Sequence, residues 1–354
     1  MEISAAGAIM GVTVGTVLSM VFLIFYLLRH RDRTESLDVP ESSGTLMKKV
    51  LLIGVPITLS NSAMSIITLI DSKIVLGRLE AISSLLAEKP AALYGQYTFG
   101  MDLINLPPSF VYPVTMSLIP FAAAAMARKD SAGANRIISS AFRLIAILAI
   151  PAGVGLSVLS GPILMMLYPA QKEAAMAAGP HLQVLGIACI FICLMTLTNA
   201  ILQSYGHERI PICTMIAGGI VKIVMNYVLV GNPDINIHGA PISTLCCYLV
   251  ISGLNLFFVW KYSPEKPRYL QLFTKPVIAS ALMGGAAWAV HGLVLQALTG
   301  GEYAYGANAL ATFLGIGAGV VVYFVLVIAL RILRAEDMKG IPHGQTLVRL
   351  LHLR

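Results

Sequence analysis

The feature that most constrains this chain is a succession of long apolar stretches, each near or above the ~20 residues that a helix needs to cross a bilayer. Nine such stretches are predicted as transmembrane helices: residues 5–28, 48–77, 92–127, 135–159, 176–204, 209–230, 239–260, 273–297 and 305–333. Charged residues make up 12% of the 354 residues, against roughly 25% in soluble domains. The sequence therefore predicts an all-α polytopic membrane protein.

The charges of the connecting loops alternate along the chain. Loops after the odd-numbered stretches carry Arg29, Arg31, Arg33, Lys48 and Lys49, then Arg128, Lys129 and Arg136, then Arg209, then Lys261, Lys266, Arg268 and Lys275, and then the basic tail. The other loops are poor in Lys and Arg. By the positive-inside rule, we expect the N-terminus outside and the C-terminus in the cytoplasm. The net charge of +7 then reflects membrane topology, and we expect no nucleic-acid partner.

The second stretch carries charges in or near its far end, at Asp71, Lys73 and Arg78. A charged side chain at membrane depth costs a few kcal/mol, so such residues usually face a protein interior or a wet cavity. One helical stripe is expected to hold Ser60, Thr68, Asp71, Val75 and Arg78. We interpret the stretch as a cavity-lining transport helix. The alternative is that its charges lie at the outer interface and reach water by snorkelling.

Two further stretches hold basic side chains. Lys222 lies near the middle of the sixth, one helical turn before Asn226. A buried lysine must find an anion or lose its proton, so its partner would be Asp71 or an anionic substrate group such as a lipid pyrophosphate. A fixed structural brace is the equal alternative. Arg143, in the fourth stretch, would either snorkel to the cytoplasmic surface or bind lipid phosphate from inside.

The third stretch is interrupted by prolines, at Pro107, Pro108, Pro113 and Pro120. Because proline removes backbone hydrogen bonds, we expect a kinked, hinge-like helix. Asn105 would satisfy a freed carbonyl or face a cavity, and Gln96 or Asn105 could contact a sugar. Small residues at 284–289 and 315–320 predict close packing of the last two helices on each other.

Four stretches carry polar residues and prolines at characteristic places within apolar helices. They are VPITLSNSAMSIITLIDSKIVLGRL, LYGQYTFGMDLINLPPSFVYPVTMSLIPFAAAAMARKD, ILQSYGHERIP and IVKIVMNYVLVGNPDINIHGAPISTLCCYLVISGLNLFFVW. Together they resemble the polysaccharide-export flippases of the stage V sporulation protein B type, a family that shares a superfamily with the lipid II flippases and the multidrug exporters. The resemblance covers nearly the whole chain.

The resemblance implies two lobes of six helices followed by two additional helices. Residues 1–34 would then be the last helix of a first lobe that lacks about five N-terminal helices. Residues 35–47 would form a cytoplasmic linker and residues 48–261 the second lobe. Residues 262–333 would form the two additional helices, and 334–354 an amphipathic basic tail on the inner-leaflet lipids. A complementary N-terminal lobe would be a partner.

The function implied is a flippase in the bacterial cytoplasmic membrane for polyprenyl-pyrophosphate-linked saccharides. The candidate substrate-binding residues are Asp71, Arg78, Arg143, Lys222, Asn226, Asn105 and Gln96. The sequence has no Walker A loop and no HExxH or GxSxG motif, so we expect neither an enzyme nor a cofactor. The five cysteines lie in apolar runs without metal-ligand spacing. The alternatives are a cation-coupled multidrug exporter of the same superfamily and a truncated, non-transporting membrane fragment.

Overall fold

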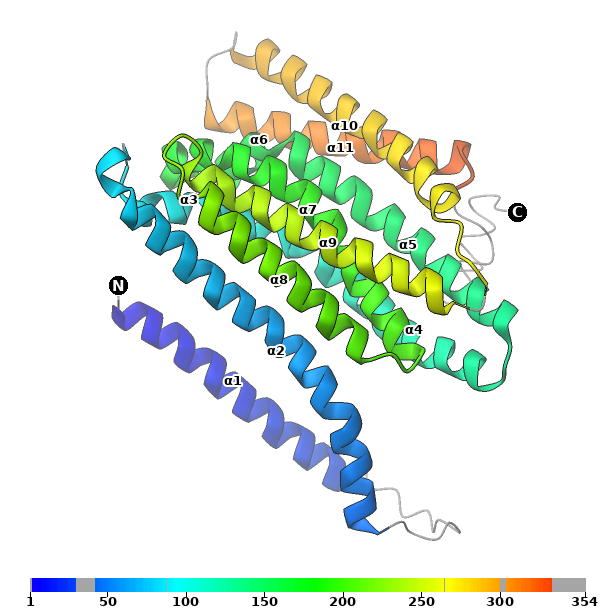
Figure 1. The fold of residues 1–354 in the computed structure, drawn as a ribbon. Helices are drawn as coiled ribbons and strands as arrows, with labels where there is room; N and C mark the ends of the chain where they lie inside the picture. Colours follow the sequence, from blue (N-terminus) through cyan, green and yellow to red (C-terminus); the bar gives the residue numbers. More distant parts are fainter. Residues whose placement is uncertain (1, 30–41, 87, 264, 300–303, 333–354) are drawn as a thin grey trace. The chain divides into compact units, whose positions relative to one another are not determined.

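The computed structural model describes residues 2–29, 42–86, 88–263, 265–299 and 304–332, and these residues form helices without any strand. The α-helices are α1 (Glu2–Arg29), α2 (Ser43–Ala81), α3 (Pro90–Ile104), α4 (Leu106–Ala127), α5 (Ser131–Val158), α6 (Ser160–Leu167), α7 (Lys172–Ser204), α8 (Arg209–Leu229), α9 (Gly239–Tyr262), α10 (Tyr269–Thr299) and α11 (Tyr305–Ala329). Three 3-10 turns join them, at Ser83–Leu85, Pro169–Gln171 and Asn236–His238. Figure 1 shows their order along the chain.

Seven segments of the described ranges are long and apolar enough to cross a membrane: Pro90–Ala127, Ser131–Val158, Pro169–Ser204, Arg209–Leu229, Asn236–Tyr262, Tyr269–Thr299 and Tyr305–Ala329. They coincide with the third to ninth predicted stretches, so the polytopic membrane protein is confirmed. The first two predicted spans are also helical. However, α1 contains only a shorter apolar segment, Thr13–Arg29, and α2 is not among the seven segments that could cross a membrane.

The chain divides into two units, residues 1–52 and 53–354. The first contains α1 and the start of α2, which begins at Ser43, five residues before the predicted span. The predicted tail 334–354 and residues 35–41 of the predicted linker lie outside the described residues. The second unit is built around α7, which contacts α3, α4, α5, α6 and α9. In the most apolar part of the span that contains α7, 67% is buried, more than in the other six spans. Helix α7 therefore forms the centre of this unit.

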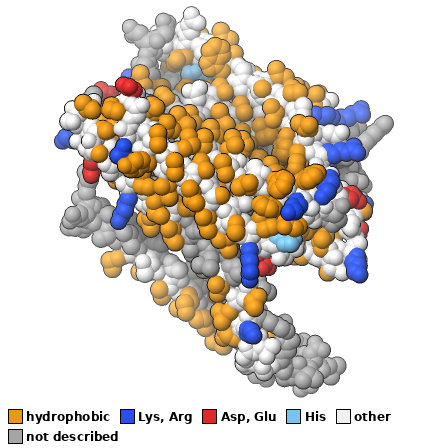
Figure 2. Space-filling view, in the orientation of Figure 1, with side chains coloured by type: hydrophobic (Ala, Val, Ile, Leu, Met, Phe, Trp, Pro, Cys, Tyr) orange, Lys and Arg blue, Asp and Glu red, His pale blue; other side chains and the backbone are white. Residues whose placement is uncertain are grey.

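Hydrophobic side chains cover most of the face shown in Figure 2, and Lys and Arg side chains gather toward its margins. Large apolar side chains are exposed along many of the helices, including Phe110 at 71% and Trp288 at 67%. A soluble protein rarely exposes contiguous apolar surface on this scale. The surface therefore agrees with helices that contact lipid.

The third predicted span is broken at Asn105, where α3 ends and α4 begins. Pro108 has no N–H group to bond the carbonyl of Ile104, four residues earlier. That carbonyl instead accepts a hydrogen bond from the thiol of Cys189 on α7, at 3.4 Å. The side-chain amide of Asn105 donates to the carbonyl of Met101 at 2.9 Å. The predicted kink is confirmed. Pro107 and Pro108 free the carbonyls of Leu103 and Ile104 and not that of Met101, so the role predicted for Asn105 stays a prediction.

Close helix packing depends on small residues at two crossings. A Cβ atom at Gly186 on α7 would lie 2.7 Å from the backbone nitrogen of Ser157 and 2.8 Å from the carbonyl oxygen of Gly153, both on α5. A Cβ at Gly315 on α11 would lie 2.9 Å from the carbonyl oxygen of Ala287 on α10. The predicted packing of the last two helices on each other is confirmed (Figure 1).

Candidate functional site

The central feature of the candidate site is a buried ion pair between α2 and α8. The ammonium nitrogen of Lys222 lies 3.0 Å from carboxylate oxygen Oδ2 of Asp71. The lysine side chain is 5% exposed and the aspartate side chain 4%. Of the two partners that the sequence leaves open for Lys222, the structure supplies Asp71.

The sequence of α8 explains why its lysine faces inward. Thr214, Gly218, Lys222 and Asn226 recur every four residues and are all buried. The opposite face carries Ile216, Ile220, Val224 and Val228, which are 51–62% exposed. A helix with one apolar face toward lipid must turn its charged side chain toward protein. The position of Lys222 therefore follows from the pattern of α8.

The second half of α2 also has one inward face. Asp71, Val75, Leu79 and Ile82 are buried, at intervals of three or four residues. Of the predicted polar stripe, Asp71 and Val75 lie on this face and Arg78 is half-buried, but Thr68 is exposed. Lys73 is exposed, as its spacing from Asp71 indicates. The side chain of Ser60 lies outside the described part. The predicted stripe is therefore buried at Asp71 and Val75 and exposed at Thr68.

Hydrogen bonds extend the ion pair onto α9. The side-chain amide of Asn226 donates to Oδ1 of Asp71, so the carboxylate has a partner on each oxygen. The hydroxyl of Ser243 in turn donates to the side-chain carbonyl of Asn226 and lies 2.8 Å from the backbone carbonyl of Ala240. Buried charges are tolerated when they are paired and hydrogen-bonded, and this network satisfies both conditions.

The same region connects to α3 through two tyrosines. The hydroxyl of Tyr97 lies 3.0 Å from that of Thr244, the residue after Ser243. The hydroxyl of Tyr94 donates to Ser72, the residue after Asp71, at 2.7 Å. Polar groups from α2, α3, α8 and α9 therefore converge around the ion pair, and we call Asp71, Lys222, Asn226 and Ser243 the ionic network.

Arg78 follows Asp71 on α2 by seven residues, about two helical turns, and lies against the end of α8. Its guanidinium carbon is 4.2 Å from the centre of the Tyr227 ring, a cation–π contact. Its buried Nε has no hydrogen-bond partner among the described residues. The guanidinium also occupies the space where a Cβ atom of Gly231 would lie. A buried cationic nitrogen without an acceptor is a group that an anionic ligand can satisfy.

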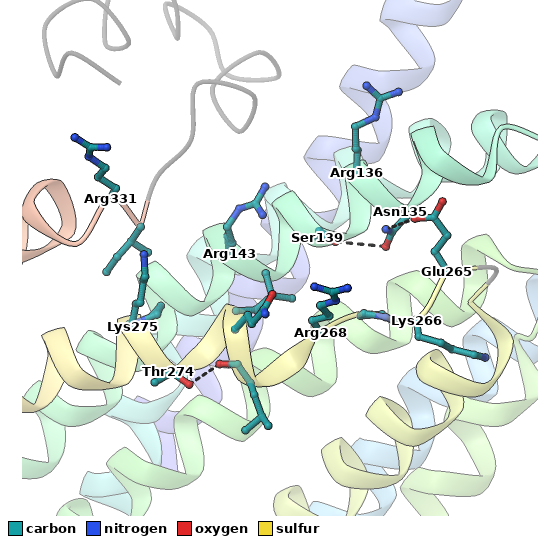
Figure 3. A pocket seen from close by; sticks show the side chains of 16 residues that line it. Asn135, Arg136, Ser139, Arg143, Glu265, Lys266, Arg268, Thr274, Lys275 and Arg331 are labelled. Carbon is teal, nitrogen blue, oxygen red and sulfur yellow. Dashed lines mark hydrogen bonds between the residues drawn. The ribbon is translucent and has the colours of Figure 1, made fainter. Parts of the chain in front are cut away.

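The remaining three predicted site residues lie elsewhere. Gln96 is buried and donates to Glu88 at 2.8 Å, beside a second pocket of about 560 Å³. Asn105 is exposed and bonds its own helix at Met101. Arg143 lines a separate basic pocket (Figure 3). The structure thus brings together Asp71, Lys222 and Asn226, places Arg78 nearby on α2, and separates the other three from them.

Sequence reasoning missed Ser243, Thr244 and Tyr97. In the sequence, only the pairing of two adjacent hydroxyl residues, Ser243 and Thr244, near the start of the otherwise apolar α9 indicates a polar site there. This indication is weak, because Ser and Thr in membrane helices commonly bond neighbouring backbone or side chains. Asn255 on α9 and Asn199 on α7 join their two helices through a hydrogen bond of 2.8 Å. Among the described residues, no group of three or more His, Cys, Asp or Glu side chains could hold a metal ion.

Comparison with known proteins adds relatives along the whole chain. The chain is 26% identical over 358 residues to the uncharacterized membrane protein YabM of Bacillus subtilis. The matched region covers 99% of this chain and 64% of YabM. It is 21% identical to stage V sporulation protein B of the same organism, over 98% of this chain and 65% of that protein. The chain therefore spans somewhat less than two thirds of the length of these relatives.

A solved structure, a crystal structure of MATE in complex with MaD3S, is 17% identical with a TM-score of 0.49, covering 85% of this chain and 70% of that one. At this level the likeness does not bear on function. The family model described as "Lipid II flippase MurJ" matches residues 2–333, nearly the full length of the chain. This chain therefore belongs to the MurJ lipid II flippase family.

Proposed function

We propose that this chain is one membrane-spanning part of a flippase that moves lipid-linked saccharides from the inner to the outer leaflet. Its family is described by lipid II flippase activity, and a relative along nearly its whole length is stage V sporulation protein B. The observation that carries the proposal is the ion pair of Asp71 and Lys222, buried in a bundle of apolar helices. An ionisable pair at such a position is costly and marks a transport pathway by default.

The substrate class follows from the charge of the candidate residues. A polyprenyl-pyrophosphate-linked saccharide presents a dense negative charge that must cross an apolar region. Lys222 and Arg78 supply two cations on the inward sides of α8 and α2, and Arg78 has a buried donor without a hydrogen-bond partner among the described residues. The structure holds Lys222 in its closed, paired form. The pyrophosphate group would take the place of Asp71 as the partner of Lys222.

The ionic network suggests how such an exchange is reversed. Protonation of Asp71, or an ion bound near it, would weaken the attraction between Asp71 and Lys222 and free the ammonium group for the substrate. Loss of that proton or ion after release would restore the pair and the bond from Asn226 to Asp71. The network joins α2 to α8 and α9, and the break at Asn105 supplies a bend between α3 and α4. Opening of the pair and bending of these helices would expose the site alternately to each side.

The proposal also assigns a structural role to each part of the chain. Residues 48–261 would form one six-helix lobe, and residues 262–333 two additional helices packed on it. Alternating access then requires a second lobe for the first to move against. Because this chain spans less than two thirds of its curated relatives, transport should be measured for the chain alone and with the N-terminal lobe of such a relative supplied.

The experiment is a leaflet-exposure assay in proteoliposomes. A fluorescent undecaprenyl-pyrophosphate saccharide is placed in the inner leaflet, and its arrival outside is read with an impermeant quencher. We expect transport by the wild-type chain, with the N-terminal lobe if needed, and at least tenfold slower transport by Asp71→Asn/Lys222→Met. Gly253→Ala, in an open position on α9, is the control. Transport of an organic cation instead would support a multidrug exporter, and transport of neither would support a non-transporting fragment.

A further inference from the structure

Two histidines outside the ionic network lie against each other. His181 is on α7, and His238 is the last residue of the 3-10 turn that precedes α9. The centres of their imidazole rings are 4.7 Å apart, and the ring planes are tilted by 52°. Because the two residues are far apart in the sequence, this contact joins the first third of α7 to the start of α9.

The ring of His181 lacks hydrogen bonds of normal geometry. The residue is 1% exposed, and neither Nδ1 nor Nε2 has a hydrogen-bond partner among the described residues, although the backbone of Gln96 on α3 lies near enough to interact with the ring. Buried polar atoms are nearly always hydrogen-bonded, so these two nitrogens are an exception. Neutral imidazole nitrogen is also the commonest metal ligand in proteins.

His238 supplies a second imidazole and a route from the surface. Its side chain is exposed, and the loop charges place this end of the bundle outside the cell. A pocket of about 560 Å³ borders the same part of α7, because its lining includes Ala177, four residues before His181. The carboxylates of Glu88 and Glu173 also line it, and its described lining contains no Lys or Arg. This charge favours the approach of a cation.

The separation of the two rings fits a single metal ion. Zn²⁺ binds imidazole nitrogen at about 2.0–2.1 Å, so two rings on one ion, at an angle of about 90–110°, have their centres about 4.5–5.2 Å apart. The observed 4.7 Å lies within this range. Imidazole suits Zn²⁺, Cu²⁺ and Ni²⁺, whereas Mg²⁺ prefers oxygen ligands.

We propose that His181 and His238 form a binding site for a divalent transition-metal ion of the Zn²⁺, Cu²⁺ and Ni²⁺ class. One nitrogen of each ring binds the ion, and water completes its coordination. The backbone of Gln96 is placed to orient His181, since metal-bound histidines commonly donate their second ring N–H to a carbonyl group. Two protein ligands make this a reversible site, unlike structural zinc sites with four.

The consequence of binding is a clamp between two elements. An ion held by both rings ties α7, the centre of the second unit, to the turn before α9. The proposal is independent of the proposed transport function, because neither histidine belongs to the ionic network. Failure of metal binding would therefore leave the account of transport unchanged, and the reverse also holds.

The test measures metal binding by the purified full chain in neutral detergent, without a polyhistidine tag. Isothermal titration calorimetry with Zn²⁺ gives the affinity, and Mg²⁺ is the control ion. The site variant is His238→Gln, because this side chain is exposed. The matched control is His207→Gln, which removes an imidazole whose ring centre lies 4.0 Å from that of Tyr262.

The expected result is a selective loss at one histidine. His238→Gln should lose at least tenfold in affinity for Zn²⁺, since even partners outside the ligand shell cost about 10–100-fold, whereas His207→Gln should lose less than twofold. His238→Cys separates loss of a ligand from misfolding, because a thiolate also binds Zn²⁺ and should retain binding. Equal losses in the two Gln variants, or loss from both His238 variants, would overturn the proposal.

Electron paramagnetic resonance of bound Cu²⁺ gives a second, spectroscopic measurement. The hyperfine pattern counts the nitrogen ligands, and we expect two nitrogens in the wild type and one or none in His238→Gln. A wild-type chain that binds Zn²⁺ no more tightly than Mg²⁺, or whose Cu²⁺ has fewer than two nitrogen ligands, would contradict the site.

Discussion

The carboxylate of Asp71 on α2 and the ammonium group of Lys222 on α8 lie 3.0 Å apart, each about 95% shielded from solvent. Asn226 donates to the second oxygen of the same carboxylate, so each oxygen of Asp71 has a partner on α8. An ion pair buried in this way adds little net stability, but breaking it by removing one partner is costly. The proposed role of the pair as a switch therefore agrees with its small net contribution to stability.

Removal of either charge alone should destabilise the protein strongly. We expect Asp71→Asn and Lys222→Met each to lower the free energy of unfolding by about 3–5 kcal/mol, because each leaves an uncompensated buried charge or donor. The double variant should lose less than either single one. Thermal unfolding in detergent, followed by intrinsic fluorescence, measures all three. Additive losses in the double variant would mean that the two side chains are not coupled.

The link from the ion pair to α9 should also be measurable. Asn226→Leu removes the donor to Asp71 and the acceptor of Ser243, and a buried polar group left unpaired costs about 1–3 kcal/mol. The matched control is Asn105→Leu, because Asn105 is exposed and bonds only its own helix in the described structure. We expect a change within about 0.5 kcal/mol there. Equal effects at the two positions would contradict the network.

The ion pair can be predicted in part from the sequence, because a lysine inside an apolar helix has few options. The sequence leaves Asp71 and an anionic substrate group as the two partners of Lys222. The four-residue spacing of Lys222 and Asn226 puts both side chains on one face of α8. The contribution of α9 was not predictable. Ser243 and Thr244 acquire their roles only because α9 packs against α8 and α3, and nothing local distinguishes them from packing hydroxyls.

The crossing of α5 and α7 should not tolerate a methyl group. Gly186→Ala would place a Cβ atom less than 3 Å from backbone atoms of α5, and overpacking of this kind costs about 1–3 kcal/mol. Gly253→Ala on α9 meets no atom within 4 Å and should be neutral or up to about 1 kcal/mol stabilising, from helix propensity. Melting temperatures of the two variants in one detergent make the comparison. Similar behaviour of the two would contradict the close approach.

The basic pocket shows a different limit of sequence reasoning. In the sequence, Arg136, Lys266, Arg268 and Lys275 indicate topology, and Arg143 indicates a snorkelling or phosphate-binding residue. Their common position depends on α10 and α11 packing with α5, so that Arg143 and Arg331 line one pocket. Charge patterns indicate the side of the membrane but not which loops meet there. The sequence singles out Gln96 for its polarity and Asn105 for its polarity and its position beside Pro107, and the structure separates both from the ionic network.

The predicted orientation can be tested directly by cysteine labelling. In a cysteine-free background, Asp234→Cys should react with an impermeant maleimide in intact cells, because the loop before α9 is expected outside. Arg128→Cys, at the end of α4, should react only after the cells are opened. Both positions are exposed, so access to the reagent depends on sidedness alone. The reverse pattern would invert the topology and place the basic pocket outside the cell.

The most direct measurement of the central claim compares stability and transport in the same variant, Asp71→Asn/Lys222→Met. The account predicts that this double variant folds with most of its stability, since both charges are gone, but moves the fluorescent lipid-linked saccharide at least tenfold more slowly in the leaflet-exposure assay. A double variant that keeps its melting temperature and transports at the wild-type rate would show that the pair has no part in transport.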